Sequence, residues 1–348
     1  MIAADPTDSL PDPPMTLVDR FFADRARGLS PVGLGCMSFG GMYGPTDEAT
    51  SRATLARAVD IGVRFWDTAN IYGEGVSEEF IGRFLADHPG SRERVILATK
   101  FAITKSADGK RVVDNSASHM REALTASLQR LRTDHVDLYY VHRYDPAVPI
   151  EETIAALAEE VKAGRIGAIG LSEVSPDTLR RAVSVHPIAA VQSEYSLWTR
   201  TPEFGLIDAC AELGALFVAF SPLGRGFFGG LLDDPRTLEP SDFRRANPRF
   251  EGVNWQRNRA HLRSYLDLAA AWGVSPAALA VAWTLAKGRH IVPIPGTRTA
   301  AHLEDDAHAA AIELTAERLA ELERLLPPGF AAGDRYSPSQ WLHVERYG

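Results

Sequence analysis

Residues 136–171 read VDLYYVHRYDPAVPIEETIAALAEEVKAGRIGAIGL, and this stretch indicates one complete β-α-β unit. The apolar run Val136–Val141 predicts a buried strand, because short continuous apolar runs are typical of parallel strands covered on both faces. Ile150–Lys162 places apolar residues three and four positions apart, which predicts a helix. Gly164 stands where such a helix would end. Ala168–Leu171 is the next apolar run and predicts the second strand.

The same alternation recurs on both sides of this unit. The predicted strands are Val32–Leu34, Val63–Trp66, Val95–Thr99, Val136–Val141, Ala168–Leu171, Ala189–Gln192, Leu216–Phe220 and Ile291–Ile294. Further helices are predicted at Glu48–Val59, Ser118–Leu131 and Asp177–Val185, with Gly214 ending another and one more beginning near His302. Strands that alternate with helices predict parallel βαβ units. Eight such units predict an α/β fold of the closed (β/α)8 TIM barrel type.

The chain reads as one domain. Residues 1–28 are rich in Pro and Asp and predict a loosely packed leader, and residues 29–348 hold the barrel and a C-terminal tail. A long segment, 224–252, follows the seventh strand, and its length indicates a functional loop or lid. A doubly wound sheet would need a GxGxxG turn after the first strand, and the segment from Gly33 to Ser38 does not fit that pattern.

Composition excludes several functional classes. The net charge of -8 argues against a nucleic-acid partner, which usually requires a basic patch. No stretch approaches the roughly 20 apolar residues that a membrane helix needs. Two cysteines, Cys36 and Cys210, without a Cys/His cluster indicate neither disulfides nor a metal site. The N-terminus lacks the features of a signal peptide, so we expect a cytoplasmic protein.

Polar residues follow consecutive predicted strands. Asp67 ends the second strand and Tyr72 follows it, Lys100 ends the third, and His142 ends the fourth. Active sites of (β/α)8 barrels lie at the carboxyl ends of the strands, so these four side chains should meet at one rim. A lysine ammonium near Tyr72 would lower the tyrosine pKa from about 10, and Asp67 would neutralise the buried lysine.

Each of the four has an ordinary structural explanation when it is taken alone. Asp67 would cap a strand end, Tyr72 would be half-buried packing, Lys100 would be a surface lysine and His142 a structural histidine. Their occurrence on consecutive strand ends favours a catalytic group. In such a group Tyr72 would donate a proton to the carbonyl oxygen of a substrate, and His142 would orient that oxygen.

The motifs around these residues resemble those of the aldo-keto reductase family. Phe65–Ala69 with Ile71–Gly73 is similar to the family's Asp and Tyr motif, Ala98–Lys100 to its lysine strand, and Tyr140–Arg143 to its histidine strand. The resemblance runs from about Leu29 to Tyr336. Three further stretches are most similar to the branch of bacterial and fungal aldehyde reductases, pyridoxal reductases and plant auxin-induced-type proteins: Gly170–Glu173, Val191–Trp198 and Ser221–Gly226.

The resemblance implies reduction of an aldehyde or ketone by hydride transfer from NADPH, with Tyr72 as general acid and with no metal. It also implies that the pro-R hydride is transferred. Two alternatives share the same residues. One is a reductase of a vitamin such as pyridoxal, and the other is a nicotinamide-binding regulatory subunit resembling the potassium-channel β-subunits. The oligomeric state and the identity of the carbonyl substrate are not indicated.

The resemblance also implies a set of cofactor contacts. Ser172 and Gln192 would hold the carboxamide, and Phe220 would stack on the nicotinamide unless it is a core residue. The loop residues Ser221, Pro222, Leu223 and Gly226 would cross the pyrophosphate. Ile294, Gly296, Thr297 and Arg298 would surround the 2′-phosphate, where Arg298 would otherwise be a solvated loop arginine.

Three departures from the family pattern concern the same ligand. Glu173 replaces the usual Asn, and His302 stands where many members have Arg. Asp305 and Asp306 would accept from the adenine amino group, but two acidic groups near an anionic ligand would weaken it. We still expect NADPH over NADH. Met37, Tyr144 and Trp198 are the candidates for the apolar substrate wall, or are packing residues.

Overall fold

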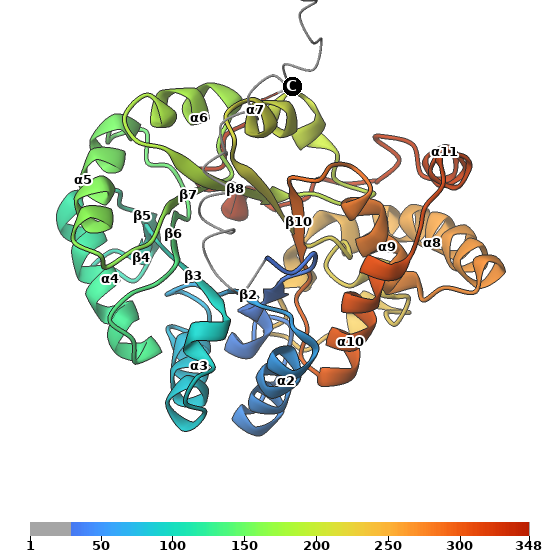
Figure 1. The fold of residues 1–348 in the computed structure, drawn as a ribbon. Helices are drawn as coiled ribbons and strands as arrows, with labels where there is room; N and C mark the ends of the chain where they lie inside the picture. The colour runs from blue at the N-terminus through green and yellow to red at the C-terminus, as the bar shows by residue number, and fades with distance from the viewer. Residues whose placement is uncertain (1–28, 348) are drawn as a thin grey trace, which may run out of the picture.

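The computed structural model describes residues 29–347 and shows a parallel eight-stranded barrel surrounded by helices (Figure 1). The strand order is β1-β2-β3-β6-β7-β8-β9-β10. The strands span Leu34–Gly35 (β1), Phe65–Asp67 (β2), Ile96–Phe101 (β3), Leu138–Val141 (β6), Ile169–Ser172 (β7), Ile188–Glu194 (β8), Leu216–Phe220 (β9) and Ile291–Ile294 (β10). The amides of Gly33 and Gly35 donate to the carbonyls of Pro293 and Pro295 at 2.9 and 3.0 Å, which joins the first strand to the last. The predicted (β/α)8 barrel is confirmed.

The helices form the outer layer of the barrel (Figure 1). They are α2 (Glu48–Ile61), α3 (Val76–Asp87), α4 (Ala117–Leu131), α5 (Ile150–Lys162), α6 (Pro176–Val183), α7 (Leu206–Glu212), α8 (Gly252–Trp272), α9 (Pro276–Leu285), α10 (Ala300–His308) and α11 (Ala316–Leu325). Several begin at a side-chain cap: Asp47, Ser116, Ser175 and Thr299 each accept from the amide three residues later. These caps satisfy amides that the first helical turn leaves unpaired.

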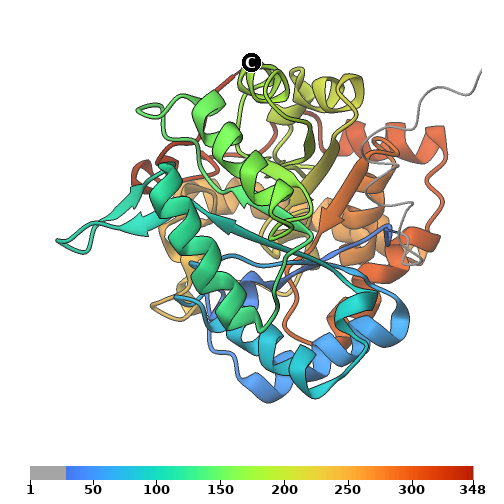
Figure 2. The ribbon, with the colours of Figure 1, turned by 60° about the vertical axis from the view of Figure 1, so that its left-hand side comes forward.

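Some elements escaped the sequence patterns. Helix α3 follows Gly75, whose φ of 101° replaces a side-chain cap, so no capping residue marked its start. Helix α9 is buried from Ala278 to Thr284 and therefore lacks a polar face and a helical period. A short antiparallel hairpin, β4 (Ile103–Lys105) with β5 (Arg111–Val113), also went unpredicted and projects beyond the barrel (Figure 2).

The core has two layers. Side chains such as Phe65, Leu138 and Val218 fill the barrel interior, and a larger apolar layer lies between strands and helices. Tyr140 needs so much interior space that a Cβ at Gly170, on the neighbouring strand, would lie 2.4 Å from its ring. The glycine is therefore required by the tyrosine.

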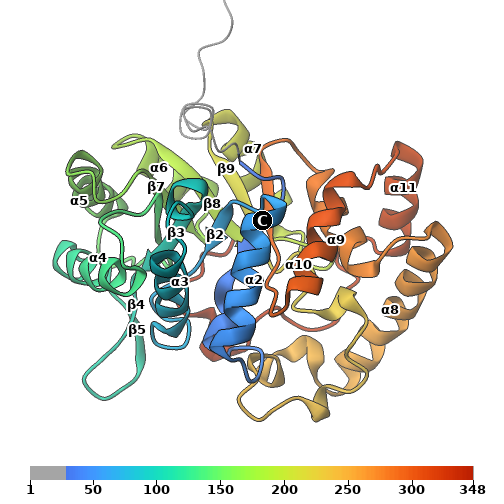
Figure 3. The ribbon, with the colours of Figure 1, turned by 60° about the horizontal axis from the view of Figure 1, so that its bottom comes forward.

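Two segments complete the carboxyl end of the barrel. Between β9 and α8 the chain forms four 3-10 helices, at Phe227–Gly229, Pro235–Thr237, Phe243–Ala246 and Pro248–Phe250, in the segment predicted as a long loop (Figure 3). After α11 the tail returns to this end and carries a further 3-10 turn at Pro338–Trp341. The predicted leader, 1–28, lies outside the described residues. Within residues 29–347 no single helix is long and apolar enough to cross a membrane. Helices α8 and α9 taken together have the length and composition of a membrane span, but they are bent by 89° where they meet.

Candidate active site

A cavity of about 620 Å³ opens at the carboxyl ends of the strands. This volume is typical of sites for small molecules and cofactors. Residues from β1, β2, β7, β8, β9 and β10 line it, together with the hairpin, the 224–252 loop, the start of α9, α10 and the tail. The lining includes Met37, Asp67, Tyr72, His142, Ser172, Gln192, Phe220, Ser221, Pro222, Leu223, Gly226, Ile294, Gly296, Arg298, Asp305 and Asp306. Most side chains predicted from sequence therefore border one space.

Lys100 and Asp67 form the buried base of the site. The Lys100 ammonium is 0% exposed and donates to an Asp67 carboxylate oxygen, to the Thr68 carbonyl at 2.7 Å and to the Tyr72 hydroxyl at 3.4 Å. Gln192 donates to the other Asp67 oxygen at 2.8 Å. The ammonium thus has three oxygen partners in a dry environment, where it holds its charge.

The pKa of Tyr72 is raised above its usual value, because burial of the phenol outweighs the opposing charge of Lys100. The expectation of a net lowering by the lysine is wrong: the ammonium acts in the expected direction but is the smaller effect. The pKa of Lys100 is itself raised, since Asp67 and Tyr72 together overcome its burial. Tyr72 is therefore a neutral phenol at pH 7 and holds the proton that a general acid must donate.

His142 lies beside Tyr72, with ring centroids 6.0 Å apart and planes nearly perpendicular. Its pKa falls well below the usual value because of burial first, and then because of the positive charges of Arg143, Lys100 and Arg111. The imidazole is neutral at pH 7. A neutral imidazole carries one N–H, and His142 lines the cavity, so the ring can donate to an oxygen there.

The backbone of Tyr72 is fixed by a close approach to Gly40. A Cβ at Gly40 would lie 2.4 Å from the Tyr72 carbonyl carbon, so only glycine fits. The Tyr72 amide donates to the Ala69 carbonyl at 3.1 Å, and its carbonyl accepts from Ser77 at 3.2 Å. The turn that follows β2 therefore presents the tyrosine at a defined position.

The proposed pyrophosphate loop has an unusual backbone. Ser221 and Arg225 have φ values of 52° and 60°, which are uncommon for residues with a side chain. Gly226 follows at 85° and lines the cavity. Glu173, which follows Ser172, is also left-handed at 57°. Such conformations persist where the surroundings enforce them and often occur at binding sites.

The region predicted to hold the 2′-phosphate is an exposed rim of the cavity. Arg298 is exposed, lines the cavity and donates to the Tyr43 carbonyl at 3.2 Å, and the start of α10 with His302 lies beside it. Thr297 differs from expectation. It is absent from the lining, and its hydroxyl donates to the Thr299 carbonyl at 3.0 Å, so we do not retain it as a phosphate contact.

The acidic pair on α10 is less negative than its sequence indicates. Burial, together with the charge of Asp305, raises the pKa of Asp306 well above its usual value. Asp305 accepts from the Ser275 hydroxyl at 2.5 Å. The pair therefore opposes an anionic ligand less than two free carboxylates would.

Of the three candidate wall residues, only Met37 lines the cavity. Tyr144 and Trp198 are outside the lining and are not retained as wall residues. Trp198 is buried in an aromatic cluster, where its ring stacks on Phe227 at 4.2 Å, and the Arg249 guanidinium lies 4.9 Å from it. These contacts connect the 224–252 loop to the segment that follows β8.

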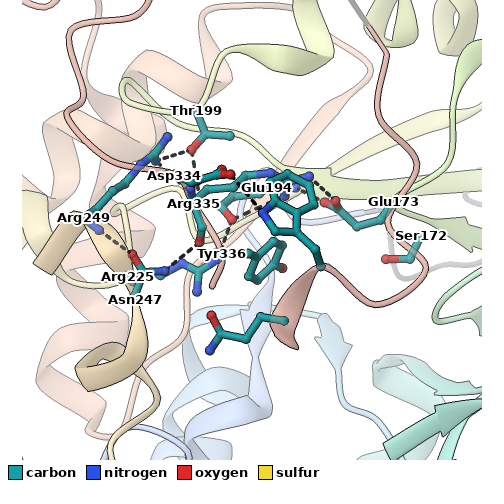
Figure 4. A network of polar contacts seen from close by, with 12 residues as sticks. Ser172, Glu173, Glu194, Thr199, Arg225, Asn247, Arg249, Asp334, Arg335 and Tyr336 are labelled. Carbon is teal, nitrogen blue, oxygen red and sulfur yellow. Dashed lines mark hydrogen bonds and ion pairs between the residues drawn. The ribbon is translucent and has the colours of Figure 1, made fainter. Parts of the chain in front are cut away.

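A buried network of ions joins this loop and the tail to β8 (Figure 4). Glu194 accepts from Arg225 at 2.6 Å and from Arg335 at 3.5 Å, with Arg249 4.0 Å away. Arg335 also donates to Glu173, whose other oxygen accepts from the Glu194 amide at 2.8 Å. The network thus contains three arginines and two glutamates. It binds the 224–252 loop and the tail, which cover the site, to β8 and the residue after β7.

Sequence patterns assigned no role to several lining residues. They are Tyr43, Arg111, Tyr336 and Gln340. Arg143 and Arg225 also line the cavity, and both belong to motifs quoted from the sequence, but no role was given to them. The position of Arg143 directly after His142 was the available signal, since residues next to the strand ends share the rim. No group of three His, Cys, Asp or Glu residues able to hold a metal ion occurs in the part of the chain that the structure describes.

Comparison with known proteins agrees with this geometry. The model of the aldo/keto reductase family matches residues 31–327. The aldo-keto reductase yakc [NADP(+)] of Schizosaccharomyces pombe is 40% identical over 311 residues, which cover 88% of this chain and 91% of that protein. A probable aldo-keto reductase 1 of Glycine max is 40% identical over 309 residues, with 88% of each covered.

Solved structures give the same result. A glycerol dehydrogenase from Gluconobacter oxydans has a TM-score of 0.78 at 30% identity, over 86% of this chain and 91% of its own. A thermostable aldo-keto reductase, solved with the inhibitor epalrestat, has a TM-score of 0.68 at 30% identity, over 85% of this chain and 95% of its own.

The ion network predicts a pH-dependent stability. The three arginines lower the pKa of Glu194 from 4.5 to about 2 despite burial. Because the folded pKa is depressed, the stabilisation is complete above about pH 4.5 and is lost as the pH falls toward 2. At roughly 1.4 kcal/mol for each pH unit between the two values, it amounts to about 3 kcal/mol.

Glu194→Gln should therefore unfold more easily than the wild type at pH 7, and the difference should shrink below pH 4.5. Denaturant unfolding at several pH values measures both. Glu212→Gln is the control, because its pair with Arg180 is at the surface, where such pairs contribute about 0–1 kcal/mol. A difference between Glu194→Gln and wild type that is constant from pH 7 to pH 3 would contradict the assignment.

Proposed function

The chain belongs to the aldo/keto reductase family, and from that premise we propose that it reduces an aldehyde or ketone with Tyr72 as the general acid. Membership makes it an NADP-dependent oxidoreductase that acts on carbonyl and alcohol groups. The observation that carries the finer proposal is that Asp67, Tyr72 and His142 line one cavity while the buried Lys100 ammonium behind them binds Asp67 and Tyr72. A neutral phenol and a neutral imidazole face the same space there.

The cavity fits a nicotinamide dinucleotide by its size and by the chemistry of its lining. Ser172 and Gln192 offer a hydroxyl and an amide to the carboxamide, and Phe220 offers a ring face for stacking. Arg225 keeps a buried Nη1 without a hydrogen-bond partner among residues 29–347, beside the left-handed loop that would border the pyrophosphate. When bound, the reduced nicotinamide supplies a hydride to the carbonyl carbon.

The side chains of this protein have separate tasks in the proposed reaction. His142 donates an N–H to the carbonyl oxygen and orients it. Tyr72 transfers its proton to that oxygen as negative charge develops there, and the Lys100 ammonium stabilises the resulting phenolate. Asp67 holds the ammonium in place and balances its charge. The atoms balance: the carbon gains a hydride, the oxygen gains a proton, and an alcohol and NADP⁺ result.

Selectivity for NADPH would rest on Arg298. A guanidinium binds a phosphate through paired donors, and the N-terminus of α10 beside it adds a favourable dipole. Thr299 caps this helix by accepting from the His302 amide at 3.3 Å. Burial, with the charge of Asp305, raises the pKa of Asp306, which reduces the repulsion expected from the acidic pair.

Tyr72→Phe should lower kcat/KM for carbonyl reduction by at least ~100-fold, since a positioned acid contributes about that much. NADPH affinity, measured by quenching of protein fluorescence, should change little because the phenol ring remains. Tyr139→Phe is the control: it removes a buried hydroxyl that donates to the Met120 carbonyl outside the cavity. Full activity of Tyr72→Phe would overturn the mechanism.

Arg298→Ala should raise the Kd for NADPH by roughly 10- to 100-fold, as the loss of a hydrogen-bonded charge pair does. The Kd for NADH, which lacks the 2′-phosphate, should change by less than about threefold. Arg289→Ala, an exposed arginine that precedes β10 at the opposite end of the barrel, should change neither. Equal losses of both cofactors in Arg298→Ala would show that this arginine does not recognise the 2′-phosphate.

A further inference from the structure

Two arginines border the cavity with Tyr72 and His142, and neither has a carboxylate partner among residues 29–347. They are Arg143, which directly follows His142, and Arg111, which begins β5 of the projecting hairpin. No ion pair involves either side chain within that range, although ion pairs occupy most other arginines close to the cavity. The whole chain has a net charge of -8, so this local excess of positive charge is a feature of the site.

Arg143 is a buried guanidinium whose partners are all neutral. It is 6% exposed, and it donates to the His142 carbonyl at 2.6 Å, to the Ser172 hydroxyl at 3.4 Å and to the Tyr336 hydroxyl at 3.4 Å. Its Nε is buried and has no hydrogen-bond partner in the described chain. A buried charge without a counter-ion is costly, and an unpaired buried donor adds to that cost.

Hydrogen bonds to its backbone and side chain fix the position of Arg143. Asn115 donates to the Arg143 carbonyl at 3.0 Å and accepts from the Asp145 amide at 2.6 Å, so one side chain fixes both ends of the turn after β6. The tail holds the other side through Tyr336, whose ring lies under Arg225 and Arg335. The guanidinium is therefore preorganised at the cavity wall and is not a loose surface group.

Arg111 reaches the same region from the hairpin. It is exposed to solvent and forms no ion pair in the part of the chain described, yet it lines the cavity. Desolvation and the nearby charge of Arg143 both lower its pKa, so the two guanidiniums repel one another. Like charges that face one cavity without a counter-ion favour a ligand of opposite charge.

The carboxylates near the two arginines already form ion pairs with other side chains. Asp67 binds the Lys100 ammonium, and Glu173 and Glu194 bind Arg335 and Arg225. Asp305 and Asp306 are on α10, near the exposed rim with Arg298. The anion that balances Arg143 and Arg111 is therefore not supplied by residues 29–347.

We propose that the carbonyl substrate carries an anionic oxygen group, a carboxylate or a phosphate monoester, which Arg143 and Arg111 bind while the carbonyl lies at Tyr72 and His142. This inference rests on the proposed reductase function and adds its substrate class. The anionic group is unchanged in the reaction: hydride still reaches the carbonyl carbon and the Tyr72 proton still reaches its oxygen. Arg143 provides the buried contact and Arg111 the contact at the mouth.

The test compares aldehydes of matched shape and different charge. In an aromatic series, 4-formylbenzoate and 4-formylphenyl phosphate are compared with the neutral methyl 4-formylbenzoate and the cationic 4-formyl-N,N,N-trimethylanilinium. In an aliphatic series, 4-oxobutanoate is compared with butanal. In at least one series kcat/KM for the anion should exceed that for the neutral aldehyde by at least about tenfold, with the cation lowest. The better of carboxylate and phosphate identifies the group.

Variants assign the preference to the two arginines. Arg111→Gln and Arg143→Gln should each reduce the anion-to-neutral ratio of kcat/KM by about 10- to 100-fold, and Arg143→Lys should retain part of it. Arg257→Gln, which removes an exposed arginine on α8 outside the cavity, should leave the ratio unchanged. Because Arg143→Gln removes a buried group, Arg111→Gln keeps the test valid if that variant fails to fold.

Three results would overturn the inference. Turnover of neutral aldehydes with no anion preference in either series would refute it and leave the proposed function standing. A fall in NADPH affinity of Arg111→Gln as large as its loss of anion preference would assign the arginine to the cofactor. Absence of NADPH-dependent turnover with every carbonyl would refute the proposed function and this inference together.

Discussion

The contact between the Lys100 ammonium and the Asp67 carboxylate is the constraint on which the site depends. Both groups are almost fully buried, and a lone buried charge of either sign would be strongly destabilising, by about 3–5 kcal/mol when one partner of such a pair is removed. The pair can form because β2 and β3 are adjacent and parallel, with Asp67 opposite Ala98. Gln192 on β8 reaches the second carboxylate oxygen, so the pair also connects opposite sides of the barrel. The charge balance of the site therefore depends on correct closure of the barrel.

Around this pair, burial decides the protonation states. It outweighs the charge of Lys100 at Tyr72 and keeps the phenol neutral, and together with three cations it keeps His142 neutral. The site therefore presents two neutral hydrogen-bond donors over a compensated ion pair. The nearby arginines differ in this respect. Arg225 and Arg335 are balanced by Glu194 and Glu173, whereas Arg143 and Arg111 are balanced by nothing in the described chain, which is the physical basis for expecting an anionic substrate.

Much of the site was predictable because parallel strands place their carboxyl ends together. Asp67, Lys100 and His142 follow apolar runs directly, so the barrel topology alone brings them to one rim. Residues whose position depends on distant packing were not predictable in this way. Tyr336 reaches the cavity only because a network of arginines and glutamates fastens the tail, and Arg111 only because an unpredicted hairpin follows β3. Trp198 and Thr297 lie outside the cavity lining for the converse reason, since each is near the site in sequence but its side chain makes contacts elsewhere.

The central claim is that Tyr72 stands in the site as a protonated acid, and its own titration tests that claim most directly. With ¹³C placed at Cζ of the tyrosines, the Tyr72 signal is identified by its absence from Tyr72→Phe and is followed from pH 6 to pH 11 by NMR. The account predicts a neutral phenol throughout the physiological range and a pKa above 10, because burial outweighs the charge of Lys100. A Tyr72 that titrates to phenolate at or below pH 8 would contradict it.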